Sequence, residues 1–202
     1  MLNILLMESN YYQLSGLSLL IFNQLTEEQA GDVCFLLPSD ERSRSIADII
    51  FHDDMVTIHI INKRQLHRSK EAARKGTERI TIHVPFLTKN ETLNDISMKI
   101  GKILAIAKAD YNLLANREEA YWKFGLKKYA QLSDTENDIM ILIGRGYNST
   151  DISRILNRSR KTISTHYRNA SRKMGAANRA EFYRYASFIA KCGRDERNTL
   201  CL

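Results

Sequence analysis

The chain has 202 residues, 44% of them hydrophobic, which is enough for one large globular domain or two small ones. Its formal net charge is +7, and 13 Lys and Arg against 7 Asp and Glu lie between residues 131 and 202. This local excess of positive charge predicts a polyanionic partner. No apolar run approaches the length of a membrane span, and residues 1–7 lack the basic start of a signal peptide, so we expect a cytoplasmic protein without membrane contacts.

The residue types that carry most enzyme and metal chemistry are scattered. The three cysteines form no CxxC pair, and the five histidines show no HxH or HExxH spacing. No P-loop, GxGxxG or GxSxG motif is present. We therefore predict no enzyme activity, no metal and no cofactor. The histidines are interpreted as structural residues, with His59 and His83 expected on neighbouring strands.

Strands and helices alternate in the first half of the chain. Apolar or β-branched runs predict four strands, at residues 2–7, 32–37, 55–62 and 79–85. Helical spacing predicts two helices at residues 12–21 and 95–107, with shorter or more polar helical segments at 40–53 and 64–75. This order is typical of an α/β domain with a shortened, doubly wound sheet, which we place at residues 1–110.

A charged and aromatic segment, residues 108–131, follows without a clean period and is interpreted as a linker with helical content, centred on residues 111–127. Its aromatic residues are expected to pack locally rather than bind a ligand: Tyr121, Trp122, Phe124 and Tyr129. Residues 194–202 form a short polar tail that we expect to be disordered.

Residues 128–193 divide into four short helices by their capping signals. The predicted caps are Ser133 with Glu136, Ser149, Ser159, and Asn178 with Glu181. Apolar residues at a three-to-four spacing give each helix one buried face. The segment 148–167 then consists of a short helix, a tight turn and a second helix, which is the pattern of a helix-turn-helix.

The third of these helices, at residues 159–175, has two different faces. One side is predicted to be buried and consists of Ile163, Tyr167, Ala170 and Met174. The other side carries hydrogen-bonding and cationic groups that suit base edges and phosphates in a major groove: Lys161, Ser164, Thr165, Arg168 and Arg172. A basic helix face is more often an ordinary solvated surface, but the local excess of positive charge favours DNA binding.

Residues 132–186 resemble the LuxR-type DNA-binding domain that NarL-like and FixJ-like response regulators share. The resemblance is carried by Leu132, Glu136, Gly146, Ile152, Leu156, Ser159, Lys161, Thr162, Ile163, His166, Lys173, Asn178 and Arg179. Asn157 departs from the pattern, because glycine is common there. The resemblance implies an all-α domain of four helices in a bacterial transcription regulator that binds double-stranded DNA as a dimer.

The resemblance also implies roles for individual residues. Base contacts would come from Ser164, Thr165 and Arg168. DNA backbone contacts would come from Lys161, Thr162, His166, Arg172 and Lys173. The helix over residues 178–189 would form the dimer contact of the DNA-bound protein, with Phe182, Tyr185 and Ala186 as candidates.

Upstream of such a domain, the α/β alternation resembles a receiver, the phosphate-accepting module of two-component systems. A receiver needs a carboxylate pair after its first strand to hold Mg²⁺ and an aspartate after its third strand. Glu8 has no second acid beside it, and Asp53 and Asp54 precede the predicted third strand, at residues 55–62. Thr88 with Lys89 matches the receiver's closing hydroxyl and lysine. We therefore interpret residues 1–110 as a degenerate receiver that phosphorylation does not switch.

Three alternatives stay open. If residues 32–37 were the third strand, Asp40 would be the acceptor of a phosphorylatable response regulator. A small-molecule-responsive regulator would need an enclosed, aromatic-lined pocket in the first domain, whereas the only tryptophan lies in the linker. A co-regulator would act mainly as a heterodimer with another regulator, its helix-turn-helix adding only non-specific affinity.

Overall fold

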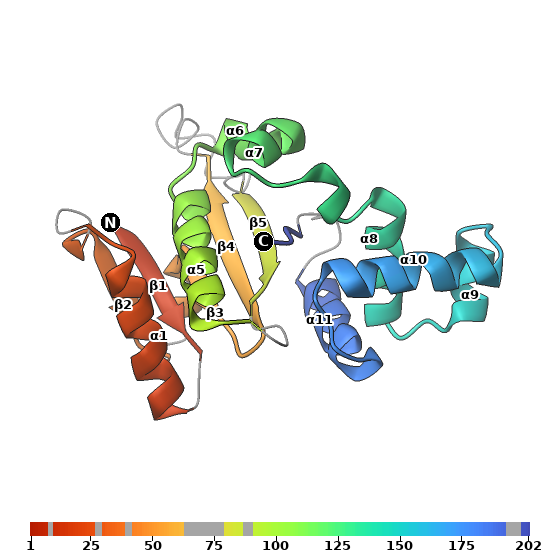
Figure 1. The fold of residues 1–202 in the computed structure, drawn as a ribbon, viewed down its shortest axis with the longest axis horizontal. Helices are drawn as coiled ribbons and strands as arrows, with labels where there is room; N and C mark the ends of the chain where they lie inside the picture. The colour runs from red at the N-terminus through yellow and green to blue at the C-terminus, as the bar shows by residue number, and fades with distance from the viewer. Residues whose placement is uncertain (8–9, 27–29, 39–41, 63–78, 87–90, 193–198) are drawn as a thin grey trace.

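A computed structural model of the protein describes residues 1–7, 10–26, 30–38, 42–62, 79–86, 91–192 and 199–202. Figure 1 shows an α/β domain beside a domain made only of helices, and both predicted fold classes are confirmed. The predicted helical segment at 64–75 lies outside the described residues, as do Glu8, Asp40, Thr88 and Lys89. None of the described helices combines the length and apolar character that crossing a bilayer requires.

Within the described ranges, five strands form one mixed sheet in the order β2-β1-β3-β4-β5. The strands are β1 (Leu2–Leu6), β2 (Val33–Leu36), β3 (Ile49–Phe51), β4 (Met55–Ile61) and β5 (Arg79–Pro85). β1 pairs in parallel with β2 and β3, whereas β4 pairs antiparallel with β3 and β5. His83 lies opposite Thr57 and His59 opposite Thr81, so the two histidines occupy neighbouring strands as predicted.

The strand count and the sheet direction differ from the prediction. Residues 40–53, predicted to be helical, contain the four-residue helix α3 (Ser43–Ile46) and then β3. The strand predicted as third is therefore fourth, and the β3–β4 hairpin makes part of the sheet antiparallel. The alternative that takes residues 32–37 as the third strand is wrong, because β2 is the second strand of the chain and lies at the sheet edge. A strand of only three apolar residues cannot be distinguished from helix by periodicity.

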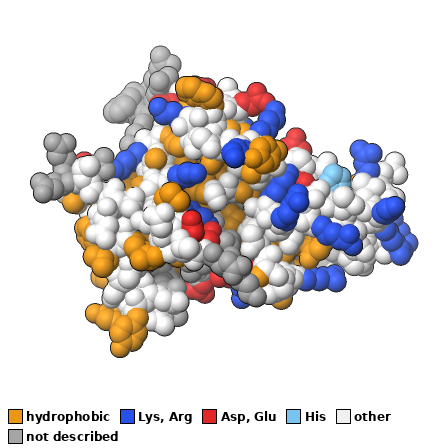
Figure 2. Space-filling view, viewed as in Figure 1, with side chains coloured by type: hydrophobic (Ala, Val, Ile, Leu, Met, Phe, Trp, Pro, Cys, Tyr) orange, Lys and Arg blue, Asp and Glu red, His pale blue; other side chains and the backbone are white. Residues whose placement is uncertain are grey.

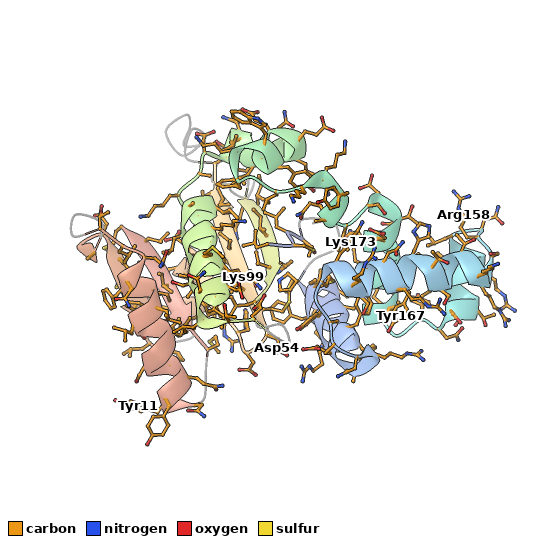
Figure 3. All side chains as sticks on the ribbon, viewed as in Figure 1. Tyr11, Asp54, Lys99, Arg158, Tyr167 and Lys173 are labelled. Carbon is orange, nitrogen blue, oxygen red and sulfur yellow. The ribbon has the colours of Figure 1, made fainter. Side chains whose placement is uncertain are left out.

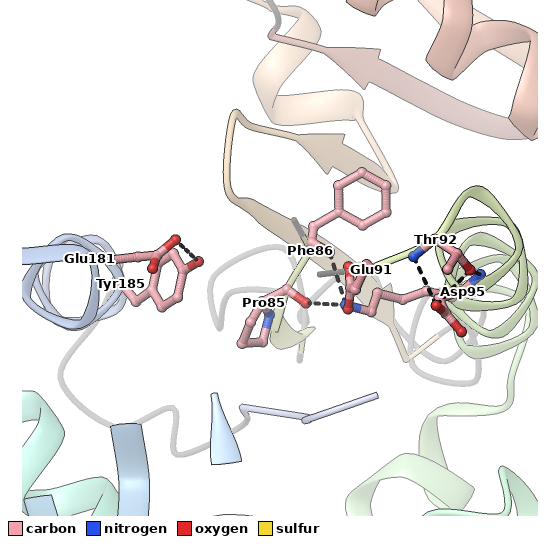
Figure 4. A network of polar contacts seen from close by, with 8 residues as sticks. Pro85, Phe86, Glu91, Thr92, Asp95, Glu181 and Tyr185 are labelled. Carbon is pink, nitrogen blue, oxygen red and sulfur yellow. Dashed lines mark hydrogen bonds and ion pairs between the residues drawn. The ribbon is translucent and has the colours of Figure 1, made fainter. Parts of the chain in front are cut away.

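Two helices cover one face of the sheet, α1 (Tyr11–Asn23) and α5 (Leu93–Ala107) (Figure 1). Their fully buried side chains meet those of the sheet in one core that includes Ile21, Ile100, Ile103, Ile4, Ile49 and Ile58. Burying one such side chain contributes roughly 1.5–3 kcal/mol. Lys99 is also buried, and its ammonium group donates to Glu91 at 2.5 Å and to the carbonyl of Phe86 at 2.9 Å (Figure 4), so the charge is compensated.

The linker is a series of short helices, α6 (Tyr111–Ala115), α7 (Arg117–Lys123) and the 3₁₀ helix η2 (Lys128–Ala130). Tyr121 and Phe124 pack against the core of the α/β domain, as predicted. Trp122 and Tyr129 do not, because they are 84% and 75% exposed. The linker therefore docks on the α/β domain through only part of its aromatic content.

Four helices form the second domain, as predicted: α8 (Asp134–Gly144), α9 (Ser149–Ile155), α10 (Arg160–Lys173) and α11 (Arg179–Lys191). Ser133, Ser159 and Asn178 are the N-caps of α8, α10 and α11. The cap of α9 is Asn148 rather than Ser149, because the Asn148 carboxamide accepts hydrogen bonds from the amides of Thr150 and Asp151.

Two backbone positions shape this domain, one in a turn and one in a helix–helix contact. Asn157, in the turn between α9 and α10, has a φ of 49°, the left-handed region in which glycine is most easily accommodated. Asparagine is among the few other residues that adopt it readily, so the departure at this position preserves the turn. At Gly144, an added Cβ would overlap the carbonyl of Ala186, so α8 and α11 pack backbone to backbone there.

The two domains touch where α11 meets the β3–β4 hairpin, a contact that we call the interdomain junction. Met55 is 2% exposed and belongs to the core of the helical domain. The Phe188 ring stands edge-on to His52, with centroids 4.6 Å apart, and the Arg184 guanidinium pairs with Asp54 at 2.7 Å. The junction thus combines apolar, aromatic and ionic contacts.

Residues 199–202, which we call the strap, return to the α/β domain. The Leu200 amide donates to the carbonyl of His83 at 2.9 Å, and the Leu200 side chain enters the core of that domain. The Gln131 side chain holds Cys201 from the other domain, donating to its carbonyl at 2.8 Å and accepting from its amide at 2.9 Å. The prediction of a disordered tail is therefore wrong for these four residues, and residues 193–198 lie outside the described ones.

Candidate nucleic-acid interface

One buried stripe fixes α10 in its domain and leaves the opposite face to solvent. Ile163 and Ala170 are 2% and 0% exposed, and α10 packs against α8 and α9. The Tyr167 ring stands edge-on to Phe182 with centroids 5.0 Å apart. The Ser159 hydroxyl accepts from the Thr162 amide at 3.1 Å and fixes the first turn. The helix is therefore held rigidly from one side only.

The three predicted base contacts share this free side of α10. Thr165 and Arg168 are exposed and Ser164 is half-buried. Arg168 follows Ser164 by four residues and Thr165 by three, the spacings at which helical side chains are neighbours, so both flank Arg168 on this side. The Thr165 hydroxyl donates to the carbonyl of Lys161 at 3.0 Å, which leaves its oxygen able to accept.

The predicted backbone contacts differ in accessibility. Lys161 and Arg172 are exposed, and Figure 2 shows Lys and Arg side chains gathered over the end of the helical domain. The Thr162 hydroxyl is bonded to that of Ser159 at 2.9 Å, so it also completes the cap. His166 is half-buried, and its Nδ1 has no hydrogen-bond partner in the part of the chain that the structure describes.

Lys173, predicted as a DNA backbone contact, is paired inside the domain. Its ammonium group pairs with Glu136 at 2.7 Å and donates to the carbonyl of Gln131 at 2.8 Å. Burial alone would raise the pKa of Glu136, but hydrogen bonds from Lys173 and Ser133 outweigh it and lower that pKa. Figure 3 labels Lys173 at the end of α10 nearest the α/β domain, far from Arg158 at the other end of the helix-turn-helix. Two of the three donors of this ammonium group are thus used inside the domain.

The three predicted dimer residues form part of the core of this domain. Phe182, Tyr185 and Ala186 are at most 1% exposed. The Tyr185 hydroxyl donates to Glu181 at 3.0 Å (Figure 4), and burial raises the pKa of Tyr185. The helical spacing of apolar residues in α11 correctly predicted a buried face. The same spacing occurs in a domain core and in a subunit interface, so it does not distinguish the two.

Two carboxylates follow the third strand, where the sequence reading found none. β3 ends at Phe51, so Asp53 and Asp54 come after it rather than before the third strand. Asp53 is exposed, and Asp54 is engaged by Arg184 at the interdomain junction. Within the described ranges, no three His, Cys, Asp or Glu side chains are grouped so that they could hold a metal ion.

Two histidines, His52 and His83, contact the Phe188 ring at the interdomain junction, and His59 lies four residues beyond Met55 on β4. The Thr57 hydroxyl is 3.4 Å from both His52 Nε2 and His83 Nδ1, and His59 bonds to Thr81 at 3.3 Å. Burial lowers the pKa of His52, His59 and His83 to about 4 in each case. These rings are therefore neutral at pH 7, and they pack as polar aromatic groups.

The second domain has the arrangement of a helix-turn-helix DNA-binding domain. It consists of the short helix α9, a left-handed turn at Asn157, and α10, whose exposed face is cationic. Residues 130–186 match the family described as "Bacterial regulatory proteins, luxR family". This part of the chain is therefore a LuxR-type domain, as the resemblance in the sequence indicated, and the protein carries a DNA-binding domain used in transcription regulation.

The other comparisons add little. One solved structure, described as "Conformational dynamism for DNA interaction in Salmonella typhimurium RcsB response regulator", is 16% identical in sequence. The similarity covers 93% of this chain and 100% of that chain, with a TM-score of 0.29, and a similarity of this size supports no inference about function. A comparison with curated protein sequences gives no match.

Proposed function

We propose that the protein is a sequence-specific transcription regulator of the bacterial cytoplasm that places α10 in the major groove of double-stranded DNA. The observation that carries the proposal is the free face of α10 within a LuxR-type domain. Lys161, Arg168 and Arg172 are exposed there and take part in none of the ion pairs among the described residues. A polyanion would supply the missing partners and release its own counterions.

The roles within this face are those that the LuxR-type resemblance implies. Ser164, Thr165 and Arg168 would read base edges, with Arg168 suited to a bidentate contact with guanine. Lys161 and Arg172 would bind phosphates, and Thr162 and His166 would add polar contacts to the backbone. Lys173 is left out of this set because Glu136 occupies its ammonium group.

We further propose that the protein binds paired half-sites as a dimer through the exposed part of α11. Arg179, Ala180 and Tyr183 are exposed on this helix, while Phe182, Tyr185 and Ala186 support it from beneath. A two-fold dimer would present two α10 helices one turn of DNA apart. Analytical ultracentrifugation with a DNA duplex tests this, and a second regulator added to the mixture distinguishes homodimers from heterodimers.

Independence from phosphorylation is the third part of the proposal. It is supported by the ion pair that engages Asp54 and by the antiparallel strand that follows β3 directly. Incubation with acetyl phosphate is expected to leave the protein unlabelled. Labelling that disappears in Asp40→Asn or Asp53→Asn would contradict this part and identify the acceptor.

The central experiment maps bound genomic sites and then measures affinity for one mapped site by fluorescence anisotropy at moderate ionic strength. We expect the mapped duplex to bind at least about 1,000-fold more tightly than a scrambled duplex of the same length. Equal affinity for both duplexes, with and without a co-regulator, would overturn the proposal of sequence-specific regulation.

A further inference from the structure

The DNA-binding domain contains a crevice with the size of a small-molecule site. It lies between the α8–α9 turn, the first turns of α10 and the start of α11, and its volume is about 630 Å³. Ligand pockets of proteins generally have volumes of roughly 300–1,000 Å³. The buried side chains of Ile152, Ile163 and Phe182 line it. A crevice of this volume, with apolar side chains in part of its lining, can hold an organic molecule.

The charge of the crevice is positive. Arg160 and Arg179, the first residues of α10 and α11, line it, and none of the described Asp and Glu residues does. Neither guanidinium takes part in an ion pair among the described residues. The acids one turn away are engaged elsewhere, Asp151 by the Asn148 carboxamide at 2.5 Å and Glu181 by the Tyr185 hydroxyl at 3.0 Å. The crevice therefore offers two guanidinium forks to an anion.

Aromatic rings also line the crevice. Tyr147 and Tyr183 line it and are 45% and 48% exposed, so a large part of each ring meets water. Tyr167, also in the lining, is fixed by its edge-on contact with Phe182. Covering exposed tyrosine rings with a flat apolar group is favourable, and offset or edge-on stacking adds to it. Inorganic phosphate would use the arginines but not these rings.

We propose that this crevice binds a small aromatic carboxylate, with the carboxylate on Arg160 or Arg179 and the ring against Tyr147 and Tyr183. Binding itself does not depend on DNA. Its consequence for DNA rests on the proposed function: Ser164 lines the crevice and lies on the free face of α10, so the ligand competes with DNA for this edge of the recognition helix.

The test is an NMR titration of the full chain without DNA, using three probes: 2-naphthoate, its neutral analogue 2-naphthamide, and inorganic phosphate. We expect saturable shifts of the Tyr147, Ser164 and Tyr183 amide signals with 2-naphthoate. The neutral amide is expected to bind at least about 10-fold more weakly, because it lacks the charge-assisted hydrogen bonds. Equal binding of both naphthyl probes, or the same shifts with phosphate, would overturn the proposal.

Substitutions in the crevice test whether it is the binding site of 2-naphthoate. Arg179→Gln and Tyr183→Ala are each expected to weaken 2-naphthoate binding by about 10-fold, while Lys191→Gln, an exposed residue on the same helix with the same charge change, leaves it unchanged. The spectrum of each variant shows whether it is folded, and Arg179→Gln changes only an exposed side chain. Shifts at these residues that follow protein concentration without any probe would instead assign the crevice to a second copy of the chain.

A competition measurement separates this inference from the proposed function. If 2-naphthoate binds and wild-type protein binds its mapped duplex, anisotropy is expected to show DNA affinity falling as 2-naphthoate is added. In Tyr147→Ala, which changes a crevice residue outside the proposed dimer face, the fall is expected only at higher 2-naphthoate concentrations. An unchanged DNA affinity at saturating 2-naphthoate overturns the competition. A wild-type protein that shows no DNA preference even without the probe contradicts the proposed function and leaves the NMR result standing.

Discussion

The exposed face of α10 and the interdomain junction use basic side chains in opposite ways. On α10, Arg168 and Arg172 are exposed to solvent and take part in none of the ion pairs among the described residues. Inside the helical domain, by contrast, Lys173 is paired with Glu136, and at the junction His52 and His83 stay neutral because burial lowers their pKa values to about 4. The surroundings of a basic residue thus determine whether it can bind a polyanion. Water stabilises an exposed charge without a partner, whereas a buried charge must be paired or neutralised.

The largest effect is expected from breaking the buried pair on the inner side of α10. Lys173→Met leaves Glu136, 5% exposed, without its counter-charge, and should lower the free energy of unfolding by about 3 kcal/mol in urea titrations. Arg172→Met, one residue away on the exposed face, should change it by less than about 0.5 kcal/mol. Similar losses in the two variants would remove the distinction between the two regions.

A slightly smaller effect is expected from acid at the junction. A histidine whose pKa falls from 6.5 to about 4 on folding binds more protons when unfolded, so its stabilising effect is complete above pH 6.5 and is lost as the pH falls toward 4. For His83, 1% exposed, the loss should be up to about 3 kcal/mol. Unfolding titrations between pH 7 and 4 should show a shallower slope for His83→Gln than for the wild type, and equal slopes would contradict the neutral junction.

On the exposed face, the effect should appear in DNA discrimination rather than in stability. Arg168→Ala together with Ser164→Ala is expected to reduce the preference for a mapped duplex over a scrambled one by about 1–3 kcal/mol, because base contacts are lost. Circular dichroism should show an unchanged melting transition. If the variant loses affinity equally for both duplexes, these residues contact the backbone and not the bases.

The smallest expected effect concerns phosphate contacts. Lys161→Ala should weaken binding to all sequences alike and reduce the slope of log affinity against log salt by about 0.9, the contribution of one neutralised phosphate. The matched change Lys191→Ala, at the end of α11, should leave the slope unaltered. A sequence-dependent loss with Lys161→Ala would move this residue into the base-reading set.

Much of the helical domain could be predicted because its signals are local. Capping side chains reach only two or three residues along the chain, as the Ser133 hydroxyl does to the Glu136 amide, so short patterns suffice to place the start of a helix. The left-handed turn at Asn157 and the buried stripe of α10 are equally local. These local features are enough to place Ser164, Thr165 and Arg168 on one face from the sequence alone.

The α/β domain was harder because its decisive contacts are not local. β3 contributes three residues whose strand character depends on pairing with β1 and β4. Because this strand was not predicted, Asp53 and Asp54 were placed before the third strand, whereas they follow it. Tertiary pairing overrides local propensity in such short segments.

Long-range partners account for the remaining errors. Lys173 meets Glu136 from 37 residues away, and Gln131 meets Cys201 from 70 residues away. No spacing rule indicates such pairs in a single sequence. The paired state of Lys173 and the ordered strap therefore become visible only in the folded chain.

The strap also constrains how the protein can be made and divided. Residues 199–202 follow the DNA-binding domain in the chain, yet Leu200 fills the core beside Leu114, Ala120 and Ile82. During synthesis on the ribosome, the α/β domain can complete this edge only after the helical domain has emerged. A fragment that ends between the domains would lack Leu200 and expose the apolar surface that Leu200 covers, so we expect the isolated α/β domain to be less soluble. The isolated helical domain would keep the contact of Gln131 with Cys201 but lose the anchoring of the strap on the α/β domain.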